Sequence, residues 1–420
     1  MGWKAISRSL AALIIAALVV LGAIAFIAYR QVQAPTETVT APGKVRVAVL
    51  FDVGGRGDLS FNDMAALGAE KAKRDLGVEV EYNTPKSLAH MVPLLEELSR
   101  GGKYDLLILV GFLWVDALNK TADKFPKQKY ALIDASTGVR RDNVAEFVFK
   151  EQEGAAVVGV LAAGMAREVQ RELGESGPIK VGAVAGMSIP PLWRFHIGYL
   201  FGVKYFEKKT GERVEFYWTY TGKFDDPALG YSAAWTFLGQ GVKVLYGLAG
   251  LTHVGMFNAV IDWNERGGGR ALAIGQDASQ EWFNPKYIPL SGSKRVDVAA
   301  YKAIEMVVKG AWRGGLVVLG YAEGGVGVWD LEGVKYFAQI AYETGQLKGL
   351  TPDDIVRIVK DARGKYVKSD VEAIAKELEG LIVTGKIVFK EPASEEEYLS
   401  IIRELEKGNL NAALAKGSIG

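Results

Sequence analysis

Acidic residues stand at the ends of three short apolar runs in this sequence. Asp52 follows VAVLF, Asp134 follows YALI and Asp277 follows ALAIGQ, while two further apolar runs end in Gly111 and Gly250. In an open sheet of parallel strands, ligands bind beyond the carboxyl ends of the strands. Carboxylates placed there would accept hydrogen bonds from ligand hydroxyls or hold a cation, and they would repel a phosphate. Each Asp could instead cap the following helix, but three together favour a ligand site.

Aromatic residues beside Gly and Asp in polar turns offer a second kind of contact. Phe61, Phe112, Trp193 and Phe224 are placed in this way. Such a ring could stack on a flat ligand, which is worth about 1–3 kcal/mol per ring by analogy with nucleic-acid bases. The alternative for each ring is packing within its own loop.

Several other chemistries lack the residues that they need. The sequence has no Cys, and its three histidines, including His253 in a predicted loop, show no metal-ligand spacing. The turn over residues 54–62 has Ser60 where a dinucleotide-binding loop needs a third glycine. Neither a GxxxxGK[ST] loop nor a GxSxG elbow occurs. We therefore expect no metal ion, no nucleotide cofactor and no catalytic activity.

The elements that would position these side chains alternate between short strands and longer helices, which is typical of α/β folds with parallel sheets. The first run predicts strands over residues 45–53, 78–84, 105–112, 129–135 and 144–150, with helices over 61–76, 87–100 and 115–124. The second run predicts strands over 179–187, 213–220, 242–250 and 270–277, with helices over 152–173, 193–209, 227–240 and 296–312. Two runs of similar size predict two doubly wound lobes. A charged amphipathic helix is predicted over 395–407.

Composition agrees with two lobes and argues against nucleic acid as a partner. The 420 residues exceed the size of one typical hydrophobic core. Lys and Arg number 50 against 49 Asp and Glu, giving a formal net charge of +1. Nucleic-acid binding normally requires a basic excess on one face of a protein.

The N-terminal region predicts a membrane anchor. Residues 10–29 contain no charged side chain, and a helix of that length spans about 30 Å, the thickness of bilayer hydrocarbon. Lys4 and Arg8 precede it, so the positive-inside rule places the N-terminus in the cytoplasm and the rest of the chain outside the cell. A cleaved signal peptide is the alternative. Residues 31–43, with prolines and threonines, predict a linker.

An ordered series of short motifs resembles the basic-membrane-protein (BMP, PnrA-like) family of solute receptors. The first is GDLSFN at residues 57–62, directly after the strand that ends in Asp52. The others follow in order: GF at 111–112, ID at 133–134, EGA at 153–155, AGM at 185–187, FDD at 224–226, GQD at 275–277, SGSK at 291–294, EGG at 323–325 and TGKI at 384–387. The similarity covers about residues 44–392. Two features depart from the family pattern: the lipid-anchoring Cys is missing, and residues 251–254 replace a more Gly-rich segment.

The resemblance implies the type I periplasmic-binding-protein fold, in which two Rossmann-like lobes joined by hinge strands close on a ligand. Well-known members of the family deliver purine nucleosides to an ABC transporter. By position, Phe61 and Phe224 would hold the base between them, while Asp277 and Lys294 would hold the ribose hydroxyls. The remaining contacts to the base and the sugar would come from Asp52, Asn62, Asp134 and the region of Gly250.

These observations predict a membrane-tethered extracytoplasmic receptor that binds a nucleoside and presents it to ABC permease subunits; the resemblance implies a purine nucleoside. A nucleoside hydrolase and a ligand sensor on the same fold are the alternatives. The predicted organisation is an anchor over 1–30, a linker over 31–43, a first lobe over 44–150 with about 275–315 returning to it, a second lobe over 151–274 with about 316–392 returning to it, and a C-terminal helix and tail over 393–420.

Overall fold

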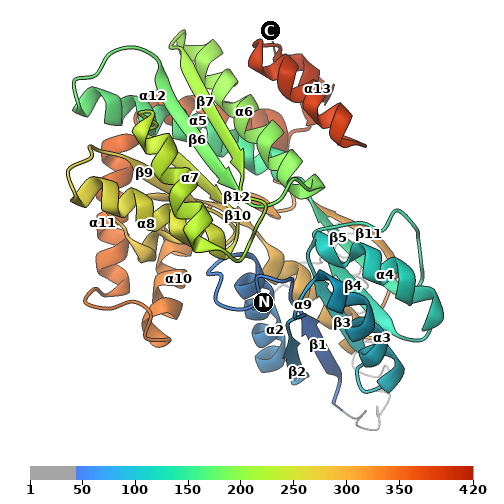
Figure 1. Ribbon diagram of the computed structural model, residues 1–420. Helices are drawn as coiled ribbons and strands as arrows, with labels where there is room; N and C mark the ends of the chain where they lie inside the picture. The colour runs from blue at the N-terminus through green and yellow to red at the C-terminus, as the bar shows by residue number, and fades with distance from the viewer. Residues whose placement is uncertain (1–43, 420) are drawn as a thin grey trace, which may run out of the picture. The chain divides into compact units, whose positions relative to one another are not determined.

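Two six-stranded sheets organise the computed structural model, which describes residues 44–419 (Figure 1). The first sheet is parallel throughout, in the order β11-β5-β4-β3-β1-β2. Its strands are β1 (Arg46–Leu50), β2 (Glu79–Asn83), β3 (Leu106–Val110), β4 (Lys129–Ile133), β5 (Val144–Phe149) and β11 (Gly315–Leu319). Its helices are α2 (Phe61–Leu76), α3 (Met91–Gly101), α4 (Val115–Thr121) and α9 (Val296–Val308). We call this assembly the first lobe.

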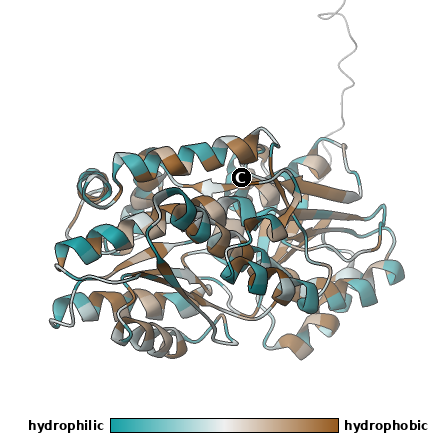
Figure 2. Ribbon diagram, turned by 90° about the horizontal axis from the view of Figure 1, so that it is seen from above, coloured by the Kyte–Doolittle hydropathy of each residue, from teal (hydrophilic) through white to brown (hydrophobic). Residues whose placement is uncertain are grey.

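Helices cover both faces of the first sheet, so its central strands are apolar over nearly their whole length, after Arg46 at the start of β1 and Lys129 at the start of β4. Val47 and Val49 pack in the same cluster as the buried residues of α2 and α9, whereas Ala48 and Leu50 pack with those of α3 and α4. Figure 2 shows the hydrophobic strands lying between helices that carry many hydrophilic residues. The alternation explains why β1 reads as a continuous apolar run in the sequence.

The second sheet has the order β12-β10-β9-β8-β6-β7, with β12 antiparallel to β10. Its strands are β6 (Ile179–Ala185), β7 (Val214–Tyr220), β8 (Val244–Leu248), β9 (Leu272–Gly275), β10 (Leu290–Lys294) and β12 (Val326–Val328). Helices α5 (Glu151–Glu172) and α6 (Pro190–Thr210) pack on one face, and α7 (Pro227–Gly239) and α8 (Leu251–Glu265) on the other. We call this assembly the second lobe.

A C-terminal segment follows the two sheets and packs mainly on the second lobe. Its elements are α10 (Leu331–Glu343), α11 (Pro352–Tyr366), α12 (Ser369–Val383), β13 (Val388–Phe389), α13 (Glu395–Glu406) and β14 (Leu414–Lys416). Buried residues of α12 and α13 belong to the same hydrophobic cluster as α5 and α6. The amphipathic helix predicted near the C-terminus is therefore present as α13, with its apolar face buried. Short 3-10 turns complete the chain at Leu88–His90, Phe112–Trp114, Ala122–Lys124, Glu281–Phe283 and Leu410–Ala413.

The chain crosses between the lobes at three places: between β5 and α5, between β10 and α9, and between β11 and β12. We predicted that residues 275–315 return to the first lobe, and this boundary is wrong. Strand β10 pairs with β9 and β12 in the second sheet, so the return begins only at α9 and then includes β11. The prediction failed because the sequence pattern did not reveal β10, β11 or β12.

The described part of the chain contains no element suited to crossing a membrane: within residues 44–419, every helix is too short or too polar to span a bilayer. The predicted membrane helix at residues 10–29 and the linker at 31–43 lie outside the described residues.

Candidate functional site

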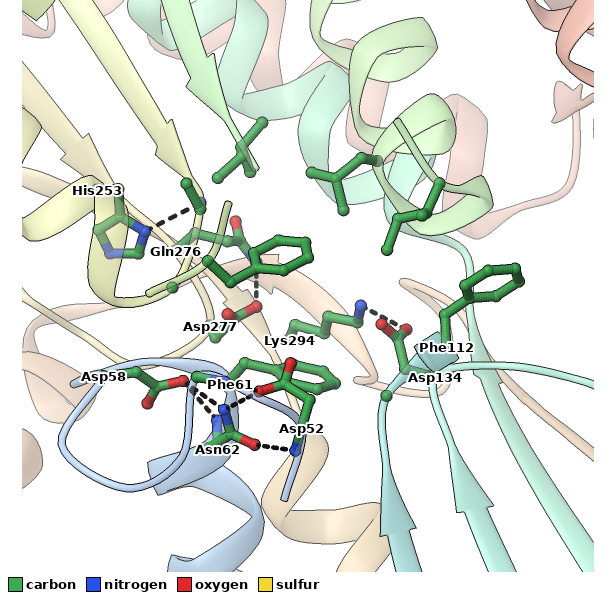
Figure 3. Close-up of a pocket in the computed structure, with 18 of the residues that line it drawn as sticks. Asp52, Asp58, Phe61, Asn62, Phe112, Asp134, His253, Gln276, Asp277 and Lys294 are labelled. Atoms are coloured by element: carbon green, nitrogen blue, oxygen red, sulfur yellow. Dashed lines mark hydrogen bonds and ion pairs between the residues drawn. The ribbon is translucent and has the colours of Figure 1, made fainter. Parts of the chain in front are cut away.

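One cavity lies between the two lobes, where the carboxyl ends of strands from both sheets meet (Figure 3). It surrounds about 620 Å³ of empty space, which includes open solvent at its mouth. The eight residues named as candidates from the sequence all line it: Asp52, Phe61, Asn62, Asp134, Phe224, Gly250, Asp277 and Lys294. Strand ends far apart in the sequence thus converge on a single site.

Asp52 is held by the Asn62 side chain and faces the cavity. The Asn62 amide donates from Nδ2 to Asp52 Oδ1 over 2.7 Å, and its Oδ1 accepts from the Asp52 backbone N–H over 3.2 Å. The Gly54 N–H also donates to Asp52 Oδ1, over 2.8 Å. No hydrogen bond among residues 44–419 occupies the other carboxylate oxygen, Oδ2, which leaves an acceptor for a ligand. Burial raises the pKa of Asp52.

Asp58 lines the same cavity but has a structural role. Its carboxylate accepts hydrogen bonds from three backbone N–H groups at the start of α2: Ser60 over 3.0 Å, Asn62 over 2.8 Å and Asp63 over 3.1 Å. These donors would otherwise be unpaired in the first turn of the helix. Capping of α2 therefore accounts for the presence of Asp58 without any role in ligand binding.

Asp277 joins the two lobes across the cavity. Its Oδ2 accepts from the Ser60 hydroxyl over 2.6 Å, and its Oδ1 accepts from Gln276 Nε2 over 3.0 Å. Burial raises the pKa of Asp277, and the nearby charge of Lys294 opposes this rise. No helix directly follows Asp277, so the capping alternative does not apply to it.

Lys294 sits at the floor of the cavity between two carboxylates. Its Nζ lies 2.5 Å from Asp134 Oδ1 and 2.8 Å from Glu151 Oε1, and the residue is only 2% exposed. Arg194 pairs with the other side of Glu151. A buried ion pair is stable only when every charge has a partner, and here two cations match two carboxylates.

The two acids of this cluster, Glu151 and Asp134, differ in how firmly they keep their negative charge. Burial would raise the pKa of Glu151, but Arg194 and Lys294 together lower it to about 2. Burial raises the pKa of Asp134, and Lys294 compensates only in part because Glu151 adds a second negative charge beside it. Glu151 is thus the firmly ionised partner, and Asp134 is the group that can hold a proton facing the cavity.

The backbone is strained at this site. Among residues 44–419, the only non-glycine residues with positive φ are Leu59 at 54°, Asp134 at 76° and Asp277 at 71°. Two of them line the cavity, and the Leu59 carbonyl accepts a hydrogen bond from Gln280 of the second lobe over 3.0 Å. Left-handed non-glycine residues cost about 1–3 kcal/mol each and cluster at functional sites.

Comparison with known proteins agrees with this geometry. Residues 44–351 match a family model described as ABC transporter substrate-binding protein PnrA-like. The chain belongs to the PnrA-like family. The resemblance seen in the sequence motifs is thereby confirmed, and the fold and the family together establish a substrate-binding protein of an ABC transporter, a class that binds small molecules and permease components.

Relatives of this PnrA-like protein occur in archaea and bacteria. An uncharacterized lipoprotein of Pyrococcus abyssi is 64% identical over 384 residues, covering 91% of this chain and 93% of the relative. Basic membrane protein B of Borreliella burgdorferi is 28% identical over 303 residues, covering 70% of this chain and 83% of the relative. The crystal structure of an ABC transporter system solute-binding protein from Aeropyrum pernix K1 has a TM-score of 0.86 and 57% identity, covering 88% of this chain and all of that one.

The two aromatic candidates reach the PnrA-like cavity from opposite lobes. Phe61 begins α2 of the first lobe, and Phe224 lies in the loop between β7 and α7 of the second. The Phe224 ring packs on Gly186, where a Cβ atom would lie 2.2 Å from Cε1. Any larger residue at position 186 would therefore displace the ring. Gly250, with φ of 54°, plays a similar part beside the backbone of the Phe224 loop, since its Cβ would lie 3.3 Å from the Phe224 carbonyl oxygen.

The two other aromatic residues that the sequence places in polar turns occupy different kinds of position in the structure. Phe112 lines the cavity. Trp193 instead stacks on Tyr398 of α13, with ring centroids 5.4 Å apart and planes 9° from parallel. For Trp193, packing is the correct interpretation.

Sequence reasoning missed several polar residues at the site. His253 was predicted in a loop, but it lies in the first turn of α8 and lines the cavity. Burial lowers the pKa of His253 to about 4, so its ring is neutral at neutral pH. Gln276 was likewise missed, although it stands in the GQD motif directly before Asp277. No cluster of three or more His, Asp or Glu residues suited to a metal ion occurs in the part of the chain that the structure describes.

Proposed function

We propose that this protein binds a purine nucleoside between its lobes and delivers it to the permease of an ABC importer at the outer face of the membrane. One observation carries the proposal: buried acceptors and aromatic rings from both lobes converge on one cavity whose cations are already paired with acids. Such a cavity suits an uncharged ligand that has both hydroxyl groups and a flat ring.

Each candidate residue has a role in this proposal. Phe61 and Phe224 enclose the base from opposite lobes. The Asp277 carboxylate and the Lys294 ammonium bind ribose hydroxyls, with Asp134 beside them. Asp52 accepts a hydrogen bond from the base or the sugar through its open Oδ2, and Asn62 keeps that carboxylate in place.

Closure of the lobes would seal the ligand from water. Hydrogen bonds from Ser60 to Asp277 at 2.6 Å and from Gln280 to the Leu59 carbonyl at 3.0 Å already link the lobes beside the cavity. Three crossing segments allow the hinge motion by which two-lobed binding proteins close. Excluding water strengthens the charge-assisted bonds to the ribose.

A thermal-shift screen tests the choice of ligand. A nucleoside present at 100 times its Kd is expected to stabilise the protein by about 2.7 kcal/mol, which appears as a higher Tm. The corresponding 5′-monophosphate is expected to give no shift at the same concentration, because the carboxylates of Asp52 and Asp277 repel phosphate. Free base and ribose, tested separately, serve as controls for partial binding. Equal shifts with nucleoside and monophosphate would contradict the proposed polarity of the site.

Replacing Phe61 with Ala tests the stacking role. We expect at least a tenfold weaker affinity for the nucleoside, equivalent to about 1.4 kcal/mol, with the Tm of the ligand-free protein nearly unchanged. Tyr342→Ala, which removes an exposed ring from α10, is the matched control. If Phe61→Ala instead lowered the Tm and left the affinity intact, Phe61 would be a packing residue only.

A nucleoside hydrolase would use the same carboxylates to orient ribose and activate water. Chromatography after long incubation with the bound nucleoside separates the two functions: an intact nucleoside supports the receptor, and released base would support the enzyme.

We further propose that residues 10–29 hold the receptor at the membrane. The Pyrococcus abyssi relative is named a lipoprotein, whereas this sequence has no Cys to carry a lipid. The apolar N-terminal segment would supply the tether in its place. Removal of residues 1–43 should move the protein from the membrane fraction to the soluble fraction of the expressing cell, and continued membrane retention would contradict this assignment.

A further inference from the structure

Arg363 of helix α11 contacts buried residues next to the binding site. This helix begins at Pro352, directly after residue 351 where the family match ends. The Arg363 guanidinium donates from Nη2 to Glu281 Oε1 over 2.8 Å and from Nε to the Pro289 carbonyl over 2.8 Å. Glu281 is fully buried, so Arg363 supplies the cation that this carboxylate needs.

The second oxygen of Glu281 organises two buried serines. Its Oε2 accepts from the Ser279 hydroxyl over 2.5 Å and from the Ser291 hydroxyl over 2.9 Å. Ser291 Oγ in turn accepts from the backbone N–H of Gln280 over 3.0 Å. The Glu281 carboxylate thus holds the loop between β9 and β10 in position.

Gln280 connects this loop to residues that line the cavity. Its Oε1 accepts from the Gln276 backbone N–H over 2.9 Å, and its Nε2 donates to the Leu59 carbonyl of the other lobe and contacts His253 Nε2 at 2.9 Å. Gln276 then donates to Asp277 Oδ1. An unbroken series of polar contacts therefore runs from α11 to the carboxylate that faces the ligand.

We propose that Arg363 is a positioning residue of the ligand site, contributed by the segment beyond the family-matched region. Without its guanidinium, Glu281 would be a buried carboxylate lacking a cation, and its side chain would turn toward water. This change removes an acceptor from Ser279 or Ser291 and frees the loop that carries Gln276, Asp277 and Gln280. The effect on ligand affinity rests on the proposed function, whereas the effect on the loop does not.

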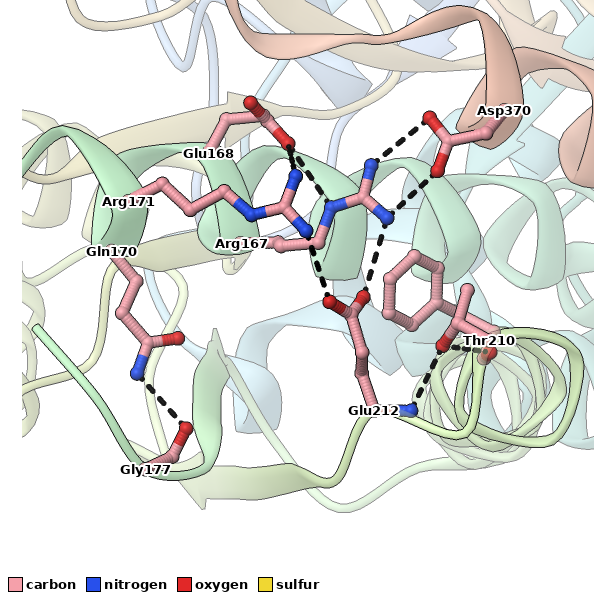
Figure 4. A network of polar contacts seen from close by, with 9 residues as sticks. Arg167, Glu168, Gln170, Arg171, Gly177, Thr210, Glu212 and Asp370 are labelled. Atoms are coloured by element: carbon pink, nitrogen blue, oxygen red, sulfur yellow. Dashed lines mark hydrogen bonds and ion pairs between the residues drawn. The ribbon is translucent and has the colours of Figure 1, made fainter.

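Arg363→Met tests this proposal, with Arg167→Met as its matched control. Arg167 is also buried, and it ties the C-terminal segment down through both oxygens of Asp370 in α12, at 2.8 and 3.0 Å, together with Glu212 (Figure 4). Its contacts do not lead to the cavity. Both variants lose one anchor of the C-terminal segment, but only Arg363→Met should disturb the site.

Two readouts are measured on the full chain: hydrogen exchange of the Gln276 and Gln280 backbone amides without ligand, and the affinity for adenosine. In Arg363→Met we expect both amides to exchange at least tenfold faster and adenosine to bind at least tenfold more weakly. In Arg167→Met both readouts should match the wild type.

Unchanged amide exchange in folded Arg363→Met, or equal acceleration in both variants, would overturn the proposal. If Arg363→Met fails to fold, Arg363→Lys decides, because it keeps a cation beside Glu281 but loses the bond to the Pro289 carbonyl. In Arg363→Lys, faster exchange than in the wild type that is confined to the Gln276 and Gln280 amides would support the positioning role. Exchange of these amides at the wild-type rate would refute it. If the wild type binds none of the purine nucleosides, the proposed ligand is wrong, and the exchange result still decides the role of Arg363.

Discussion

Replacing Lys294 with Met is expected to have the largest effect on this protein. The substitution leaves Asp134 and Glu151 side by side in the interior with Arg194 as the remaining cation. Removing one partner from a buried ion pair costs about 3–5 kcal/mol because the other charge stays buried without compensation. Nucleoside binding should be lost at the same time, since the ammonium facing the cavity is gone.

The loss of stability in Lys294→Met should depend on pH. Burial and the charge of Glu151 already raise the pKa of Asp134 in the wild type, and without the lysine that opposes this rise the folded-state pKa lies still further above the unfolded value of about 3.9. The folded state then binds more protons than the unfolded state at intermediate pH, so the free energy of unfolding falls as pH rises through that window. Urea unfolding at pH 5 and pH 8 measures the difference, and the variant should be closer to wild type at pH 5.

Lys335→Met is the control for Lys294→Met. Lys335 pairs with Asp353 at the surface, 2.8 Å away, where an ion pair is worth about 0–1 kcal/mol. We expect little change in stability at either pH. A Lys294→Met variant as stable as this control at pH 8 would show that the Asp134–Lys294–Glu151 cluster is not an obligatory charge balance.

The second large effect is expected from Asp277→Asn. The amide keeps the size of the side chain, and Asn tolerates the left-handed backbone at φ of 71°, whereas Ala would add strain. The charge that strengthens hydrogen bonds to ribose hydroxyls is lost, and bonds to charged groups contribute about 1.5–3 kcal/mol. Titration calorimetry should therefore show affinity reduced by more than tenfold, with the Tm of the ligand-free protein nearly unchanged.

Asp226→Asn provides the comparison for Asp277→Asn. Asp226 caps α7 by accepting from the Ala228 and Leu229 N–H groups, away from the cavity lining, and Asn caps helices about as well. The affinity of Asp226→Asn for the nucleoside should equal that of the wild type. Equal losses of folding and of affinity in Asp277→Asn would mean that Asp277 acts mainly by holding Ser60 and the lobes together.

Much of the fold could be predicted because its signals are local. The apolar run that forms β1 and the helical pattern that forms α2 gave boundaries close to those of the structure, and α2 spans Phe61–Leu76 as expected. Strand β10 was missed because its sequence LSGSK lacks apolar alternation; its place in the second sheet depends on pairing with β9 and β12. The domain boundary near residue 275 was wrong for the same reason.

The candidate site was predictable wherever its residues follow a strand or lie in a family motif. Asp52, Asp134 and Asp277 stand at strand ends, and the structure brings all three to one cavity. Glu151 and Arg194 gave no such signal, because their pairing joins α5 to α6 across 43 positions of sequence. The contact of Glu281 with Arg363 spans 82 positions and likewise requires the folded chain.

Calorimetric titration of the purified, ligand-stripped wild type with adenosine, guanosine, inosine, cytidine and uridine tests the central claim most directly. Circular dichroism on the same sample establishes that the protein is folded. We predict saturable heat corresponding to one site per chain with at least one purine nucleoside. A folded sample that gives no heat with any of the five nucleosides would contradict the proposal that this PnrA-like protein is a nucleoside receptor.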